Sequence, residues 1–185
     1  MTEPTLHTSR LELWHLSIED IETIVREPLS RQVWENKPYQ NTFQVFVGDP
    51  GPLLWRLPQA LKDSSTNKWF VRLVVERTTR EVIGSISFHE PPSPDGTIEV
   101  GLEIVQERRR RGFAREALLA MWTWAVDQPG VVTLRYSVGE TNTPSLALIR
   151  SLGFTRVGSQ MDDIDGPEEI FEMTSAEFRR LYCAD

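Results

Sequence analysis

The stretch "QERRRRGFAREALLAMWTWA", residues 106–125, sets four consecutive arginines and a glycine directly before a helical pattern. Small and apolar residues recur there at the spacing of one helix face, namely Ala114, Ala117, Leu118, Met121 and Ala125. The sequence "DQPG" at 127–130 ends the helix. Just before the arginines, "TIEVGLEIV" at 97–105 is typical of a strand. The stretch therefore predicts a strand that runs through a short basic turn into a helix.

Such a junction suits a phosphate group. The first N–H groups of a helix have no partner within the helix, and the helix dipole adds partial positive charge there. Gly112 has no side chain to block an anion, and Ala114 is nearly as small. The stretch is neither a Gly-Lys-Ser/Thr phosphate loop nor a Gly-x-Gly-x-x-Gly turn, so ATP, GTP and dinucleotides lose support as ligands.

Composition narrows the class of protein. The 185 residues are 39% hydrophobic and 25% charged, as expected for one globular domain over residues 1–185. The single cysteine, Cys183, forms no internal disulfide or CxxC metal site, and neither a signal-peptide pattern nor a membrane-length apolar run occurs. We therefore expect a soluble, cytoplasmic protein without a membrane partner. The net charge of −7 argues against general nucleic-acid binding and favours cationic ligands, which makes the arginine run more informative.

The rest of the chain mixes strands and helices. Strand patterns occupy 10–16, 69–77, 82–90, 132–138, 154–160 and 168–174. Helical patterns cover 18–27, with a capping sequence at Ser17 and Asp20, and 143–152, with Thr143 as the expected N-cap, Pro144 at N1 and Gly153 after the end. Shorter helices are expected at 53–62 and 175–182. Periodicity is weak in 29–68. This order predicts an α+β (mixed α/β) fold.

Three motifs resemble those of the GNAT family of N-acetyltransferases. In "IEVGLEIVQERRRRGFAREAL", Arg109, Gly112 and Ala114 match the family's Arg/Gln-x-x-Gly-x-Gly/Ala motif. "TNTPSLALIRSLGF" resembles its second motif through Asn142, Ser145 and a following Leu-Gly-Phe. "TSRLELWHLSIED" at 8–20 is similar to the opening of the branch that acetylates ribosomal-protein N-termini. The resemblance covers nearly the whole chain apart from 29–68.

The family resemblance implies a fold and a co-substrate. The expected fold is a central, mostly antiparallel twisted sheet with one splayed strand pair and helices on both faces. Acetyl-CoA would bind as co-substrate without a metal, its diphosphate on the main chain of 109–114, its pantetheine beside Ile104 and Val105, and its arm near Asn142. The implied cofactor-binding residues are Ile104, Val105, Arg109, Arg110, Arg111, Gly112, Phe113, Ala114 and Asn142.

The resemblance also implies a chemistry. The acceptor is a primary amine that attacks the thioester, and Glu99 matches the position of the family's water-relayed base, with Glu103 a weaker candidate. Gly101 fits the family's strand bulge, where a backbone N–H would stabilise the oxyanion. Where the family often carries an acidic tyrosine, this chain has Ile149, and Ser145 suits support of the helix start better than replacement of that acid.

Other functions stay open at this stage. A CoA-binding sensor or interaction module of the same fold is the main alternative, and an RNA- or ribosome-associated role of the arginines is a weaker one. The acceptor is a protein N-terminal α-amine or a small-molecule amine, and segment 29–68 is expected on the acceptor side. Trp34 and Trp55 are candidates for its pocket. Oligomeric state is not fixed by the sequence; a homodimer is one option.

Overall fold

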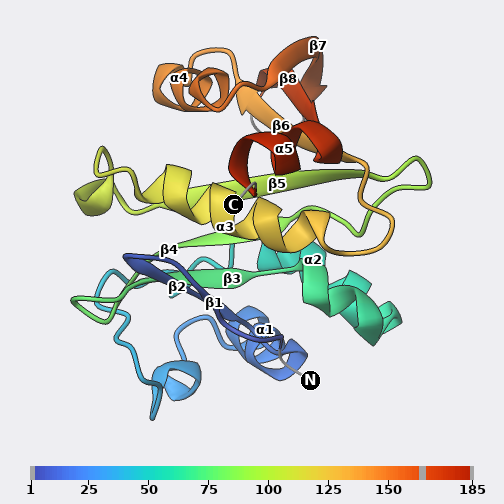
Figure 1. The fold of residues 1–185 in the computed structure, drawn as a ribbon. Helices are drawn as coiled ribbons and strands as arrows, with labels where there is room; N and C mark the ends of the chain where they lie inside the picture. The colour runs from blue at the N-terminus through green and yellow to red at the C-terminus, as the bar shows by residue number, and fades with distance from the viewer. Residues whose placement is uncertain (1–2, 163–165, 184–185) are drawn as a thin grey trace. The chain divides into compact units, whose positions relative to one another are not determined.

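The computed structural model describes residues 3–162 and 166–183, in two compact units. Among the described residues, the first unit comprises 3–90 and 102–121, and the second comprises 91–101, 122–162 and 166–183. Strand β5 (Thr97–Ile104) and helix α3 (Phe113–Val126) contribute residues to both (Figure 1). The eight strands follow the order β1-β2-β3-β4-β5-β6-β8-β7, which confirms the expected mixed α/β fold with a mostly antiparallel sheet.

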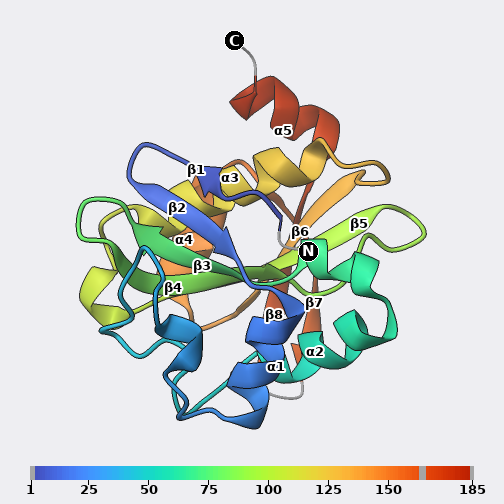
Figure 2. The same cartoon turned by 90° about the horizontal axis from the view of Figure 1, so that it is seen from below.

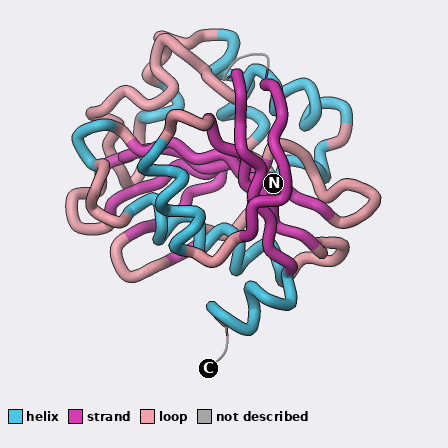
Figure 3. Tube along the Cα trace, turned by 90° about the horizontal axis from the view of Figure 1, so that it is seen from above, coloured by secondary structure: helices cyan, strands magenta, loops and turns pink. Residues whose placement is uncertain are grey.

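The first unit is built on an antiparallel run of strands. These are β1 (Leu6–His7), β2 (Leu11–His15), β3 (Arg72–Glu76) and β4 (Glu81–Phe88). Helices α1 (Ile18–Arg26) and α2 (Leu53–Lys62) lie side by side in this unit (Figure 2). Short 3-10 turns occupy Gln32–Trp34, Ser64–Trp69 and Gln106–Arg108. Figure 3 marks the long loops between these elements.

Local sequence signals explain the start of this unit. In β2 the side chains alternate between buried and partly exposed, with Leu11 and Leu13 fully buried. Ser17 and Asp20 form the predicted capping box at α1, because each side chain accepts a hydrogen bond from the other residue's backbone N–H. Ile21 and Ile24 then bury the apolar face of the helix. Strand β2 and helix α1 therefore both bury apolar side chains in the core of this unit.

The second unit contains the C-terminal elements. Strand β6 (Thr133–Gly139) pairs antiparallel with β8 (Gly166–Thr174), which pairs antiparallel with β7 (Thr155–Asp162). Helices α4 (Thr143–Ser151) and α5 (Ser175–Tyr182) complete it. Trp122 is fully buried, stacked on Phe154 at 4.6 Å and edge-on to Phe178 at 6.1 Å, as expected for a core tryptophan.

Strands β5 and β6 pair over a short length. Their parallel register covers Thr97–Glu99 and Thr133–Arg135, and each strand continues beyond it. The end of this register agrees with the splayed pair expected from the family resemblance. On the other side of β5, the N–H of Val105 donates to the carbonyl of Ile83 at 2.9 Å.

Two local predictions were wrong. The N-cap of α4 is Asn142, not Thr143, because the Asn142 side chain accepts from the N–H of Ser145. The strand expected at 69–77 begins only at Arg72, since Trp69 closes a 3-10 turn that is capped by Asp63. In the weak segment, α2 spans Leu53–Lys62 as expected, with Pro58 inside it. None of the described helices combines the length and apolar character that membrane crossing requires.

Candidate active site

The turn between β5 and α3, residues Arg109–Ala114, is called the cradle below, after the anion-binding role that the sequence predicts for it. Arg110 and Gly112 both adopt left-handed backbone conformations, with φ of 61° and 80°. Arg109, which precedes them, is extended. Within 3–162 and 166–183, the N–H groups of residues 110–114 donate no backbone hydrogen bond, whereas that of Arg109 donates to Gln106. Five main-chain donors thus lie at the start of a helix, as predicted.

Two of the four arginine side chains brace the turn. The Nε of Arg109 donates to the carbonyl of Ile104 at 2.7 Å, and its Nη2 lies 3.6 Å from Glu103. The Nε of Arg108 lies 3.2 Å from Glu76 on β3. Arg110 and Arg111 have exposed side chains. The main chain therefore forms the cradle, and Arg108 and Arg109 hold it against the strands.

An N-terminal residue that sequence reasoning missed completes this brace. The Nη1 of Arg10 donates to the carbonyl of Arg111 at 2.9 Å, and its guanidinium lies 4.7 Å from the centre of the Phe113 ring. A Cβ on Gly112 would lie 3.3 Å from Nη2 of Arg10. Arg10 thus packs against the cradle from a segment about a hundred positions earlier, and glycine at 112 leaves room for it.

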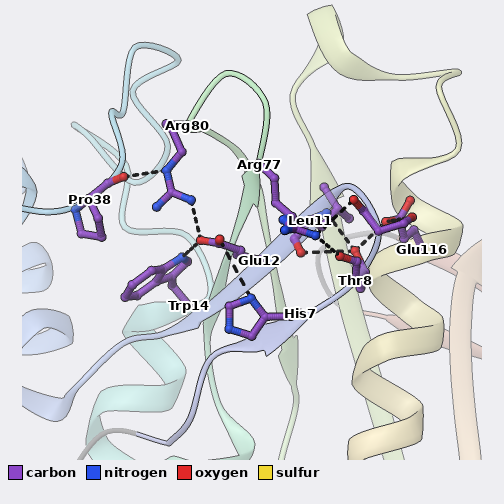
Figure 4. Close-up of polar contacts among 10 residues, drawn as sticks. His7, Thr8, Leu11, Glu12, Trp14, Pro38, Arg77, Arg80 and Glu116 are labelled. Atoms are coloured by element: carbon purple, nitrogen blue, oxygen red, sulfur yellow. Dashed lines mark hydrogen bonds and ion pairs between the residues drawn. The ribbon is translucent and has the colours of Figure 1, made fainter.

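Glu116, in the first turn of α3, anchors the same N-terminal segment. One carboxylate oxygen accepts from Thr8 at 2.5 Å, as Figure 4 shows. The same oxygen accepts from Ser9 at 3.1 Å and from the N–H of Arg10 at 2.8 Å. Partial burial acts to raise the pKa of Glu116, but these hydrogen bonds outweigh it and hold the pKa below its usual value. The carboxylate is therefore ionised and fixes the start of α3.

A second cluster, also drawn in Figure 4, holds the β2 strand. The Glu12 carboxylate accepts from Trp14 and Arg80, each at 2.8 Å, and Arg80 also donates to the carbonyl of Pro38. Burial acts to raise the pKa of Glu12, but its hydrogen bonds to Trp14 and Arg80 lower it overall. The cluster ties β2 to the loop that leads into residues 41–52.

The end of β5 borders a cavity of about 250 Å³ in the first unit. One wall is the loop at residues 43–52; the other is formed by Gly84 and Ser85 of β4 with Glu103 and Val105. Segment 29–68 therefore supplies one wall of a cavity, although neither Trp34 nor Trp55 lines it. The aromatic side chains of the cavity come from Phe43 and Phe46 instead.

The backbone carbonyl groups of Ile104 and Val105 each already accept a hydrogen bond. The Ile104 carbonyl accepts from Arg109, and the Val105 carbonyl accepts from the N–H of Arg108 at 2.9 Å. A carbonyl oxygen has two lone pairs, so both retain acceptor capacity. The expected pairing of a pantetheine with this backbone stays a prediction.

The remaining predicted residues lie in the second unit. Glu99 is on β5, in register with Arg135 of β6, and Arg135 is bound by Glu172 at 2.6 and 2.8 Å. Asn142 caps α4 through the N–H of Ser145. The Ser145 hydroxyl lies 2.8 Å from that of Tyr136, and burial raises the pKa of Tyr136. Ser145 therefore has a phenol partner that the sequence did not indicate.

At the position where the family often has a tyrosine, Ile149 is fully buried. The described residues contain no group of three or more His, Cys, Asp or Glu side chains arranged to hold a metal ion.

The order of strand, cradle and helix agrees with the acetyltransferase class, and comparison with known proteins places the chain in one family. Residues 10–155 match the model of the acetyltransferase (GNAT) domain, so the chain belongs to the GNAT family. It is 25% identical over 162 residues to "Uncharacterized N-acetyltransferase p20" of Bacillus licheniformis, covering 85% of this chain and 86% of that protein.

Solved structures share the fold. The ribosomal-protein-S5-alanine acetyltransferase of Vibrio fischeri superposes with a TM-score of 0.66 at 16% identity, covering 95% of this chain and 99% of that one. The spermidine N-acetyltransferase of Vibrio cholerae, solved with CoA and spermine, gives 0.63 at 17% identity, covering 92% and 99%. At these identities the likeness concerns the fold alone.

Proposed function

We propose that the protein transfers the acetyl group of acetyl-CoA to a primary amine by direct attack within a ternary complex. The observation that carries this proposal is the set of main-chain N–H groups at residues 110–114, which have no backbone partner at the start of α3. Such donors and the helix dipole suit the diphosphate of CoA. The protein's membership of the GNAT family supports the same co-substrate.

The binding residues follow from that arrangement. The cradle would hold the diphosphate through its main chain, and the exposed guanidinium groups of Arg110 and Arg111 would add charge-assisted bonds to phosphate oxygens. The pantetheine would run beside Ile104 and Val105. In the second unit, Asn142 would contact the arm of the co-substrate with the amide group that its capping bond leaves over.

The acceptor must lose a proton before it attacks. Deprotonating a lysine-like amine at pH 7 costs about 4.6 kcal/mol, against about 1.4 kcal/mol for an α-amine. We propose Glu99 as the base, acting through water, since it lies where the register of β5 and β6 ends. Ile149, which is buried, stands where the family often has a tyrosine, so that residue cannot protonate the leaving group. In this scheme the sulfur departs as a thiolate, which a thiol of pKa about 8.5 allows without an acid.

The relatives leave both acceptor sources in play. One structural neighbour is named as a ribosomal-protein-S5-alanine acetyltransferase and another as a spermidine N-acetyltransferase, so proteins of this fold are named for both protein and small-amine acceptors.

The test measures thiol release from acetyl-CoA with a panel of amines and peptides. Glu99→Gln should lower kcat by about 10²-fold, the lower range for loss of a general base. Asp127→Asn, which removes an exposed carboxylate after α3, should leave kcat unchanged. Mass spectrometry of the product should show the addition of one acetyl group.

Two alternative functions give other results. A CoA-binding module would show thermal stabilisation by CoA without turnover on any amine. An RNA-associated protein would retain RNA in a salt-dependent manner even at saturating CoA.

A further inference from the structure

The cavity beside Glu103 has walls of different character. In the strand wall, the backbones of β4 and β5 lie very close together at Gly84. A Cβ on Gly84 would lie 2.1 Å from the carbonyl oxygen of Glu103, so position 84 has no room for a side chain. The opposite wall, residues 43–52, is an irregular loop. Its side chains and the Glu103 side chain of the strand wall therefore decide what the cavity accepts.

That loop holds a defined shape. The Asn41 side chain accepts from the N–H of Val45 and donates to its carbonyl, both at 2.9 Å. Gln44 and Phe46 adopt left-handed conformations with φ of 55° and 61°, which non-glycine residues rarely do. The N–H of Gly48 donates to Pro28 at 2.8 Å. Backbone strain of this kind collects at binding sites, where the surrounding structure maintains it.

The cavity combines apolar side chains with polar and acidic groups. Phe43, Phe46 and several aliphatic residues line it together with Gln44 and Ser85, and among the described lining residues the charged ones are Asp49 and Glu103, with no lysine or arginine. One oxygen of Asp49 accepts from the N–H of Gly51 at 2.9 Å. The Glu103 side chain is 77% exposed and pairs loosely with Arg109, so it remains accessible to a second cation.

On the basis of the proposed function, we infer that this cavity receives the acceptor, a primary amine on a compact apolar body, aromatic or branched aliphatic. The ammonium group pairs with Glu103, and the body packs on Phe43 and Phe46. The ammonium group gives one proton to the base, and the neutral nitrogen attacks the thioester carbonyl. The C–N bond forms, the C–S bond breaks, and the second proton lost by the nitrogen passes to the thiolate of CoA.

Size and charge separate this acceptor class from a polyamine. The cavity of about 250 Å³ is smaller than the roughly 300–1,000 Å³ of sites for drug-sized ligands. A long polycation would need further carboxylates along its path, whereas aromatic and aliphatic side chains line most of the rest. The same chemistry is offered by a free amine and by the first residue of a polypeptide with an apolar side chain.

A panel on the unmodified protein tests the class. Thiol release from acetyl-CoA is measured with 2-phenylethylamine, a tetrapeptide beginning with phenylalanine, ethanolamine and spermidine. We expect kcat/KM for one of the first two to exceed that for ethanolamine and spermidine at least tenfold, and the faster of the two identifies the source. Preference for spermidine or ethanolamine would overturn the inference while leaving the acetyltransferase intact. No turnover with any amine would remove the proposed function itself.

Matched variants test the residues. Phe46→Ala should raise KM for the preferred amine about tenfold, within the 10- to 200-fold range for lost apolar contacts, with KM for acetyl-CoA unchanged. Trp55→Ala removes an aromatic residue that is 52% exposed and outside the cavity, and should change neither KM. Glu103→Gln should raise the amine KM about tenfold, whereas Glu107→Gln, which alters an exposed carboxylate of the following turn, should not. Equal effects within either pair would refute the assignment.

Discussion

Arg10 and Glu116 form a two-point contact between the N-terminal segment and the helix that carries the cradle. The Nε of Arg10 lies 2.7 Å from one oxygen of Glu116, and its backbone N–H donates to the other oxygen at 2.8 Å. Since Nη1 of Arg10 also reaches the carbonyl of Arg111, one side chain fixes both the cradle and the first turn of α3. The position of the cradle therefore depends on residue 10.

Replacing Arg10 tests this dependence. Arg10→Ala should raise KM for acetyl-CoA about tenfold, since hydrogen bonds to charged groups contribute about 1.5–3 kcal/mol. Arg10→Lys should recover part of the loss, because a lysine keeps the charge but not the planar fork. Arg77→Ala is the control, since Arg77 binds the carbonyls of Thr8 and Ser9 without reaching the cradle. An equal rise in that variant would show that anchoring of the turn, not contact with the cradle, is responsible.

Gly112 offers a test of the cradle's main chain. Gly112→Ala places a side chain at φ of 80°, and the strain should lower the free energy of unfolding by about 1–2 kcal/mol. It should also raise KM for acetyl-CoA about tenfold, because the main chain moves. Gly130→Ala, at φ of 88° with nothing within 4 Å of the new Cβ, should show the same destabilisation and an unchanged KM. Thermal unfolding and steady-state kinetics separate the two effects.

Arg108 and Arg110 should differ in their effect on the amine, although Arg108 also braces the cradle through Glu76, so that Arg108→Ala should raise KM for acetyl-CoA as well. The Arg108 guanidinium lies 5.0 Å from the ring centre of Phe43, in the loop wall of the cavity, so Arg108→Ala should raise the amine KM several-fold. Arg110 belongs to the cradle and has an exposed side chain, so Arg110→Ala should raise KM for acetyl-CoA instead. Identical kinetic changes in both variants would mean that the arginines act only through their summed charge.

His15 predicts how stability depends on pH. Its Nε2 lies 2.8 Å from the carbonyl of Asn67, and burial lowers the pKa of His15 to about 4. An unfolded chain takes up this proton near pH 6.5, so it binds more protons than the folded chain between those values. The free energy of unfolding should fall by about 3 kcal/mol from this group as pH drops from 6.5 to 4.

Denaturant unfolding at several pH values measures that fall. His15→Gln should flatten the dependence between pH 6.5 and 4. An unchanged slope in the variant would assign the acid sensitivity to other groups.

The sequence predicted the elements whose signals are local. The helix after Gly112, the capping box at Ser17 and the extent of α2 all follow from residues close together in the chain. The same local reasoning gave the wrong N-cap for α4. Asn142 and Thr143 are adjacent and both are good N-cap residues, and only the hydrogen bond from the N–H of Ser145 to Asn142 identifies Asn142 as the cap.

Long-range contacts account for what the sequence did not reveal. Arg10 and Glu116 are 106 positions apart, and no local sequence pattern around either residue indicates that the two side chains interact. An acidic residue in the first turn of a helix is favourable because of the helix dipole alone. The position of Glu116 in the sequence therefore did not indicate its hydrogen-bond partners. Phe43 and Phe46 were not predicted to line the cavity, because an irregular loop has no hydrophobic periodicity. Trp34 and Trp55 were chosen as candidates instead, because tryptophan is the largest aromatic residue.

Gly84 has a consequence for anyone who redesigns this enzyme. A methyl group there would overlap the main-chain oxygen of Glu103, and no rotamer change relieves a clash with backbone. Position 84 in the strand wall of the cavity is thus closed to any larger residue. Changes of selectivity are better made in the loop wall, residues 43–52. There Val45 and Val47 can be replaced while the hydrogen bonds of Asn41 maintain the loop conformation.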